Sequence, residues 1–167
     1  MDDHGKLNDF DVVTALEWLA GYCQSGHRVD VVLMSFGRPK EPGEANPDDL
    51  VAAVKKLAEL DVQLVASAGN DHSHTEELPA CLAMDPELPV VSVGAGTSAA
   101  DHEPYSNHGP WVREWRSGSH VSLMPLTAEG KDPNGYAVWS GTSFSAAIYA
   151  GELAQERADE RKASAGS

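Results

Sequence analysis

The sequence predicts an α/β protein with a mostly parallel sheet that helices cover on both faces. Segments with the apolar spacing of helices alternate with short, β-branched apolar runs, which are typical of strands buried on both faces. Helix and strand in repeated succession require right-handed crossovers and therefore parallel strands. With 167 residues, of which 41% are hydrophobic, the chain is long enough for a single domain with one core.

The first helix is predicted over 8–24, where apolar residues recur at helical spacing. Asn8 or Asp9 can cap its first turn, and Gly26 lies just past its end. A mostly apolar, β-branched run over 29–36 predicts the first strand.

A second helix and strand follow a loop. The segment 38–47 contains three prolines and is expected to lie on the surface. A helix is predicted over 48–60, with Asp48 or Asp49 as its cap, and a buried strand over 62–68.

The C-terminal part continues the pattern less regularly. It predicts a short helical turn over 78–84, strands over 90–95 and 120–126, a short strand that begins near Tyr136, and a helix that opens at Ser143. The last residues, 157–167, are expected to fray.

Residues 94–99 match the dinucleotide fingerprint Gly-x-Gly-x-x-Ala, which requires a helix immediately afterwards. Pro104 follows instead and would break such a helix, so no nucleotide cofactor is expected here.

Charge and cysteine content narrow the classes of partner. Twelve Lys and Arg against 26 Asp and Glu give a net charge of −14, which argues against nucleic acid or an anionic membrane as partner. Cys23 and Cys81 have no metal-binding or redox spacing and are expected to be small apolar residues. The first residues lack the pattern of a secretion signal, so we expect either a cytoplasmic chain or a true N-terminus upstream of Met1.

Ser143 lies where a short strand runs into a helix of small residues. Backbone N–H groups of a first helical turn favour negative charge, so a hydroxyl there can act as a nucleophile whose own N–H stabilises the oxyanion. The alternative, that Ser143 is only a helix cap, is the commoner role of such a serine.

Five segments together carry a family resemblance. In order they read Val-Asp-Val-Val-Leu-Met-Ser-Phe-Gly, Val-Gln-Leu-Val-Ala-Ser-Ala-Gly-Asn-Asp, Pro-Val-Val-Ser-Val-Gly-Ala, Tyr-Ser-Asn-His-Gly-Pro and Ser-Gly-Thr-Ser-Phe-Ser-Ala-Ala. Over about 9–156 the chain resembles the subtilisin-like serine proteases, or subtilases. The resemblance implies that 1–167 is a single partial catalytic domain whose sheet is incomplete at the N-terminal side.

The resemblance also implies an activity, namely serine-type endopeptidase hydrolysis of peptides or proteins through an acyl-serine intermediate. Ser143 matches the family nucleophile, and Asn70 matches the side-chain donor of the oxyanion hole. The segments that match the walls of the primary specificity pocket are Ser35-Phe36-Gly37 and Ser67-Ala68-Gly69, and Thr142 is assigned to substrate binding with them.

Departures from the family pattern carry further expectations. Ala147 replaces a usual proline and should be tolerated, whereas Arg38 stands where a second glycine is common. We expect Arg38 either to narrow the specificity pocket and attract acidic substrate residues, or to point from its loop into solvent.

The largest departure concerns the catalytic triad, because the family's Asp and His segments precede the strand over 29–36 and neither is found in this sequence. We therefore expect the isolated chain to be nearly inert, with the missing N-terminal part of the domain as a possible partner. The alternative is an inactive, subtilase-like peptide-binding module.

One polar cluster remains, the segment 71–77 with its His72-Ser73-His74 sequence. Two histidines flanked by carboxylates can bind zinc, but polar loops also collect such residues by chance. No calcium-ligand run matches the family, and we assign no metal site to the chain.

Overall fold

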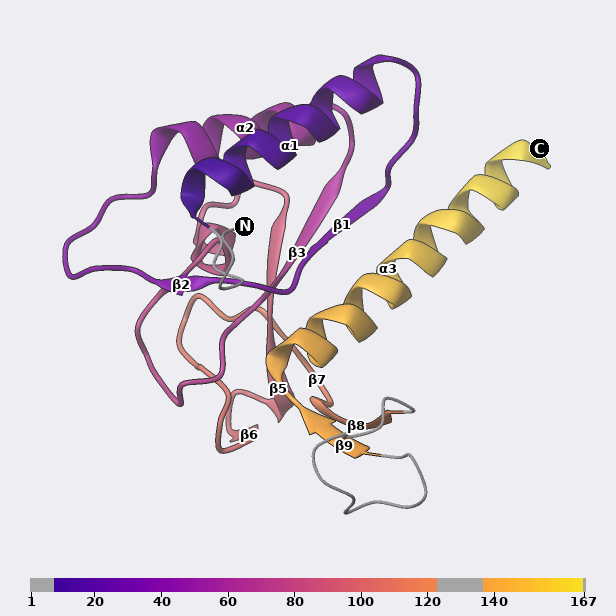
Figure 1. The fold of residues 1–167 in the computed structure, drawn as a ribbon. Helices are drawn as coiled ribbons and strands as arrows, with labels where there is room; N and C mark the ends of the chain where they lie inside the picture. The colour runs from indigo at the N-terminus through magenta and orange to yellow at the C-terminus, as the bar shows by residue number, and fades with distance from the viewer. Residues whose placement is uncertain (1–7, 123–136, 167) are drawn as a thin grey trace.

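The computed structural model describes residues 8–122 and 137–166. Its main sheet has five strands, and four of them run parallel in the order β1-β3-β5-β7 (Figure 1). The bounds are β1 Val31–Met34, β3 Gln63–Ser67, β5 Val90–Ser98 and β7 Glu114–Arg116, with β6 Asp101–His102 antiparallel to the end of β5. The predicted fold class is therefore confirmed, and β1 forms one edge of the sheet.

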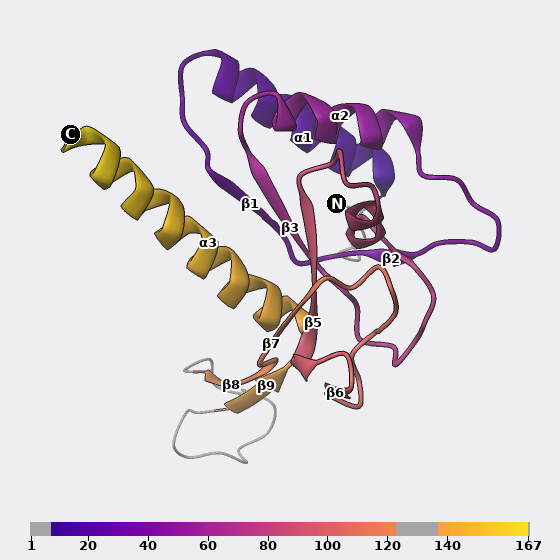
Figure 2. The ribbon, with the colours of Figure 1, turned by 180° about the vertical axis from the view of Figure 1, so that it is seen from behind.

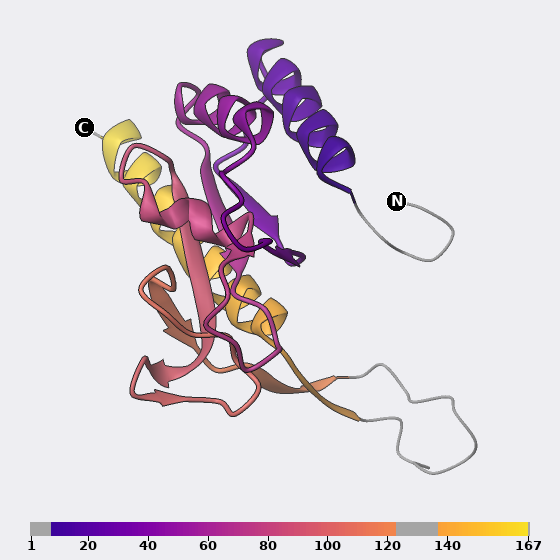
Figure 3. The ribbon, with the colours of Figure 1, turned by 90° about the vertical axis from the view of Figure 1, so that its left-hand side faces the viewer.

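Helices cover both faces of this sheet (Figures 2 and 3). Helices α1 Asp9–Gln24 and α2 Asp48–Ala58 pack on one face, over the larger part of the core. Helix α3 Thr142–Ala165 packs on the other face, where Ala146 and Ala150 contact Val65 and Val93. Burying this apolar surface on both faces explains why the central strands lack polar alternation.

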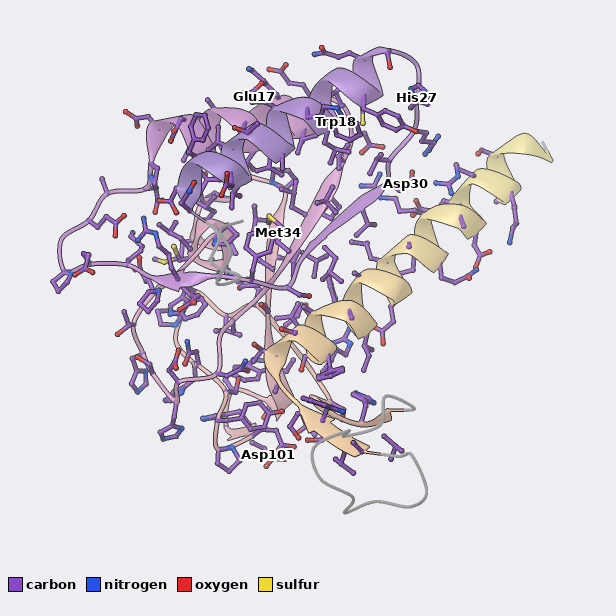
Figure 4. The ribbon with its side chains drawn as sticks, in the orientation of Figure 1. Glu17, Trp18, His27, Asp30, Met34 and Asp101 are labelled. Carbon is purple, nitrogen blue, oxygen red and sulfur yellow. The ribbon has the colours of Figure 1, made fainter. Side chains whose placement is uncertain are left out.

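Ion pairs hold the C-terminal half of α3 to the start of the sheet. Arg161 pairs with Asp30 at 2.8 Å and Arg157 pairs with Asp61 at 2.7 Å. Asp30 lies on the side of β1 that faces α3, while Met34 lies beneath α1 (Figure 4). We expected 157–167 to fray, but the structure continues α3 to Ala165.

The two N-terminal helices begin differently. The Asn8 side chain accepts a hydrogen bond from the Asp11 N–H at 2.8 Å, so the predicted cap of α1 is confirmed. At α2 the cap position is Pro47, which offers no side-chain acceptor, and the prediction of Asp48 or Asp49 as the cap is wrong. Both aspartates instead lie in the first turn, where the helix dipole favours them.

Short pairings account for most other differences from the predicted elements. Part of the expected surface loop forms β2 Arg38–Pro39, which pairs antiparallel with β4 Glu77–Leu78. The predicted turn is the 3-10 helix η1 Ala80–Met84, and β5 runs on to Ser98, so no helix follows the glycine fingerprint.

A separate two-stranded sheet lies beside the start of α3. It pairs β8 Ser119–Ser122 with β9 Ala137–Ser140 in antiparallel register (Figure 1). The predicted strand over 120–126 begins in β8, and the rest of it lies outside the described residues. In the described part of the chain, no helix is both long and apolar enough to cross a membrane.

Candidate active site

Ser143 lies in the first turn of α3. This helix begins at the carboxyl-terminal edge of the sheet (Figure 1). Ser143 is half-buried, and its Oγ donates to the carbonyl oxygen of Ser35 at 3.4 Å. Ser35 Oγ donates in return to the carbonyl oxygen of Ser143 at 3.5 Å. These long contacts bring the chain after β1 against the N-terminus of α3, across 108 residues.

Asn70 lies beside the same helix terminus. Its Oδ1 accepts a hydrogen bond from the backbone N–H of Thr142 at 2.8 Å. Because an N–H can only donate, this bond assigns the oxygen of the Asn70 side chain to Thr142. The donor atom Nδ2 therefore points away from this hydrogen bond. Nδ2 makes no hydrogen bond to the described residues and lies beside Gly141, where an added Cβ would be 3.5 Å away.

Thr142 connects the helix to the segment after β3 that carries Asn70. Its side chain is fully buried, and its Oγ1 accepts from the backbone N–H of Gly69 at 3.0 Å. Gly69 has a φ of +99°, which glycine adopts without strain. The side chain of Thr142, a residue that the sequence assigns to substrate binding, thus faces the protein and positions the chain around Asn70.

The two segments expected to form the pocket walls follow neighbouring parallel strands. Because β1 and β3 are parallel, their carboxyl ends meet at the same edge, where ligands of α/β proteins usually bind. The first segment comprises Ser35, Phe36 and Gly37; the second comprises Ser67, Ala68 and Gly69. Ser67 and Ala68 are buried, and Phe36 packs against the main core.

Glu77 lies between these two segments. The sequence placed it among the carboxylates of the polar segment 71–77 and did not link it to the pocket walls. A Cβ at Gly37 would lie 2.7 Å from Glu77 Cγ, and one at Gly69 would lie 3.3 Å from Glu77 Cδ. The residue is only 6% exposed, and its Oε2 has no hydrogen-bond partner among the described residues. Burial, with a smaller contribution from Asp71, raises the pKa of Glu77 to about 7.

The guanidinium of Arg38 pairs with carboxylates other than Glu77, although its positive charge opposes the rise in the pKa of Glu77. Its guanidinium binds Asp9 Oδ2 and Glu44 Oε1, each at 2.6 Å. The hydrogen bonds from Arg38 hold the pKa of Glu44 at about 2. These two ion pairs link α1 to the loop after β2, and the Arg38 side chain stays 37% exposed to solvent.

No imidazole or carboxylate is hydrogen-bonded to Ser143 Oγ within the described part of the chain. His120 is the nearest candidate along the chain, and its ring lies 6.0 Å from that of Phe144. Its Nε2 bonds the carbonyl oxygen of Ser117 at 3.1 Å and must therefore donate. The lone pair of a neutral His120 ring is then on Nδ1, and this atom makes no hydrogen bond to Ser143 Oγ in the described part of the chain.

Comparisons with known proteins relate nearly the whole chain to one family. The family model described as the subtilase family matches residues 1–165. The solved structure of the prenylagaramide maturation protease PagA is 27% identical with a TM-score of 0.65, over 92% of this chain and 52% of that chain. A mutant of the protease domain of PatA is 25% identical with a TM-score of 0.64, over 89% and 49%.

A lanthipeptide protease at 22% identity, with a TM-score of 0.63 over 90% of this chain and 51% of that chain, shows the same fold. No curated protein matches the chain. The chain spans about half the length of the solved structures that it matches.

Proposed function

The chain belongs to the subtilase family, and we propose that it carries the nucleophile and the oxyanion hole of a serine endopeptidase. The observation that supports this most strongly is the arrangement at the start of α3. Ser143 lies in the first helical turn, and Thr142 holds the amide of Asn70 so that its Nδ2 is left to bind a ligand. A hydroxyl next to an uncommitted amide donor and a helix N-terminus is an arrangement suited to acyl transfer.

In the proposed reaction, Ser143 Oγ attacks the carbonyl carbon of the scissile peptide bond. Asn70 Nδ2 and the backbone N–H of Ser143 donate hydrogen bonds to the oxyanion that forms. The C–N bond breaks, the amine leaves with a proton, and water then hydrolyses the acyl-serine to regenerate Ser143. A histidine base oriented by an aspartate, both from outside these 167 residues, takes the proton from Ser143 and delivers it to the amine.

The experiment compares reaction with a fluorophosphonate probe in two proteins, the 167-residue chain and a version extended upstream through the Asp and His segments. We expect rapid labelling of the extended protein, very slow labelling of the short chain, and none in Ser143→Ala. Ser145→Ala is the matched control, since this serine lies two residues further along α3. Asn70→Ala in the extended protein should lower kcat by about 10²–10³-fold.

Each outcome decides between two functions, an endopeptidase with a divided triad and an inactive peptide-binding module. Rapid labelling of the short chain would show that it has its own base and would refute the divided triad. If Ser143 stayed unlabelled in the extended protein as well, the inactive peptide-binding module would be correct.

The part of the domain that would hold the other two triad residues has a suitable place to dock. The β1 strand is an edge of the sheet, and beside it lies an apolar groove between α1 and β1. Trp18 and Leu33 line this groove and are 67% and 41% exposed. Because exposed sheet edges and apolar grooves are usually covered, we propose that the missing N-terminal part of the domain binds here.

We propose further that Glu77 gives the enzyme a preference for a basic residue before the scissile bond. Its carboxyl group lies between Gly37 and Gly69 with an unpartnered oxygen, and no cation among the described residues pairs with it. A guanidinium or ammonium entering between these segments would satisfy that oxygen and draw Glu77 into its charged form. The preference rests on the proposed endopeptidase activity.

The matched substrates for this test are peptides with arginine or citrulline at that position, which differ mainly in charge. We expect the extended protein to favour arginine in kcat/KM, and Glu77→Gln to remove most of that preference. Glu76→Gln is the control, because Glu76 already pairs with Lys40 at 2.9 Å. Cleavage of both peptides at equal rates would contradict the role of Glu77 and leave the endopeptidase activity standing.

A further inference from the structure

Three histidines from separate parts of the chain meet at the end of the sheet opposite the loop that joins α1 to β1. His72 follows β3, His102 ends β6, and His108 lies in the loop before β7. One ring nitrogen from each forms a triangle whose members all lie within 4.8 Å of one another. We propose that His72, His102 and His108 bind a divalent transition-metal ion of the zinc type.

The backbone around the cluster is held by hydrogen bonds between the two loops. The N–H of His72 donates to the carbonyl oxygen of Tyr105 at 2.9 Å, and the N–H of His108 donates to that of Ser73 at 3.0 Å. Asn107 is 1% exposed, and its Oδ1 accepts from the N–H groups of Asp71 and Ser73 at 2.9 and 3.0 Å. The ligand-bearing positions are therefore placed by the protein before any ion arrives.

Hydrogen bonds also set the tautomer of two of the rings. Nδ1 of His102 bonds the carbonyl oxygen of Ala99 at 3.1 Å, and Nδ1 of His108 bonds that of Ser106 at 3.2 Å. A carbonyl oxygen can only accept, so each Nδ1 carries the proton and each neutral ring keeps Nε2 as a free lone pair. Metal-ligating histidines in proteins are oriented by this same kind of outer hydrogen bond.

The remaining geometry suits a small ion that prefers nitrogen. Bonds of about 2.0–2.1 Å in a tetrahedron separate two nitrogens by about 3.4 Å, so a side of the triangle as long as 4.8 Å must contract by about 1.4 Å. His72 is exposed and can rotate toward the other two rings. Three imidazoles favour Zn²⁺, Co²⁺, Ni²⁺ or Cu²⁺ over Ca²⁺ and Mg²⁺, which prefer oxygen ligands.

A fourth histidine lies close by, because the ring centroids of His74 and His108 are 4.0 Å apart. His74 is therefore near enough to act as the fourth ligand of a four-coordinate site, and a water is the alternative fourth ligand. The sequence placed His72 and His74 in one polar loop, but only the fold adds His102 and His108. Four of the seven histidines thus gather at one place, on a chain whose net charge of −14 favours a dication.

The test uses the 167-residue chain stripped of metal with EDTA. Zn²⁺ is titrated by calorimetry, and Co²⁺ is added as a spectroscopic probe. We expect one equivalent of Zn²⁺ to bind and Co²⁺ to give the intense visible absorption of a four-coordinate nitrogen site. The double change His102→Ala and His108→Ala should lower the Zn²⁺ affinity at least tenfold and abolish that absorption.

Two further variants test the third proposed ligand and provide a control. His72→Asn removes one imidazole but keeps a residue that tolerates the φ of +50° found there, and it should also weaken binding. His27→Ala is the matched control, since His27 lies at the end of α1 against Tyr22, and it should bind as the unchanged chain does. Absence of Zn²⁺ binding, or unchanged binding in both the double variant and His72→Asn, would overturn the proposal.

Discussion

Glu77 shows how a single residue can depend on its neighbours having no side chains. Gly37 and Gly69 leave the space that the glutamate fills, and a Cβ at either position would press against it. The cost is a buried carboxyl group with an oxygen that no described residue satisfies. Such a group avoids ionisation while it is alone, which is why its pKa rises to about 7.

This raised pKa predicts a particular dependence of stability on pH. Between about pH 4.5 and 7 the folded chain keeps a proton on Glu77 that the unfolded chain releases. The stabilisation is therefore fully present below about pH 4.5 and is lost as the pH rises through 7. We expect this one group to lower the free energy of unfolding by about 3 kcal/mol over that range.

Urea denaturation at several values between pH 4.5 and 8 checks the expectation. Glu77→Gln should remove the loss that the unchanged chain shows, whereas Glu76→Gln should retain it. Equal slopes for the unchanged chain and Glu77→Gln would mean that Glu77 is ionised in the folded state throughout this range.

At the scale of elements, the start of α3 depends on contacts with β3 more than on its own capping. Gly141 occupies the cap position and has no side chain to accept from the first turn. Asn70 and Thr142 supply the connection instead, one bond in each direction between the strand end and the helix. This reciprocal pair keeps Asn70 and Ser143 together, so it affects both stability and the proposed chemistry.

Replacing Thr142 by valine should show how much the hydrogen bond between Gly69 and Thr142 contributes to the stability of the fold. Valine has nearly the same shape, but it would leave the backbone N–H of Gly69 without its acceptor. We expect the free energy of unfolding to fall by about 1–3 kcal/mol, the usual cost of an unsatisfied buried donor. Thr97→Val, at an exposed threonine bound to Asp101, is the control and should cost less than about 0.5 kcal/mol.

Thermal and urea unfolding of Thr142→Val and Thr97→Val, measured side by side, give the loss in the free energy of unfolding for each variant. If Thr142→Val were as stable as the Thr97→Val control, the contact between Thr142 and Gly69 would contribute nothing to holding α3 against the sheet.

At the scale of the whole molecule, two features concern the proposed docking: β1, which is an edge strand among the described residues, and the apolar groove beside it. Trp18 stands out from α1 above β1 (Figure 4), and Leu33 lies on β1 itself. The chain covers about half of the matched solved structures. In the proposed docking, a further part of the domain covers this side of the molecule.

Expressing the upstream segment as a separate polypeptide tests this docking. We expect it to bind the 167-residue chain in calorimetry and to accelerate fluorophosphonate labelling of Ser143. Leu33→Asp should weaken the association at least tenfold, because it places a charge in the apolar groove. Val121→Asp is the control on β8, where the side chain is 70% exposed and lies outside the groove. Equal affinity of the two variants would show that the segment does not bind at β1.

Sequence reasoning succeeded where the physical signal is local. The apolar spacing of α1 and α2, and the buried runs of β1, β3 and β5, predicted the α/β class because each element satisfies its own periodicity. Helix capping depends on local geometry that a sequence leaves open, so Asn8 was a correct cap and Asp48 a wrong one. Strand β7 was missed because three half-buried residues carry no pattern.

By itself, the sequence determined the order of the three long helices and of strands β1, β3 and β5, and it marked Ser143 and Asn70 through short motifs. Only the tertiary structure decided which distant side chains meet. Arg38 joins Asp9, Glu77 enters between Gly37 and Gly69, and His72 meets two histidines from later in the chain. These meetings depend on how the loops after parallel strands pack against one another, and packing across tens of residues leaves no periodic signal in the chain.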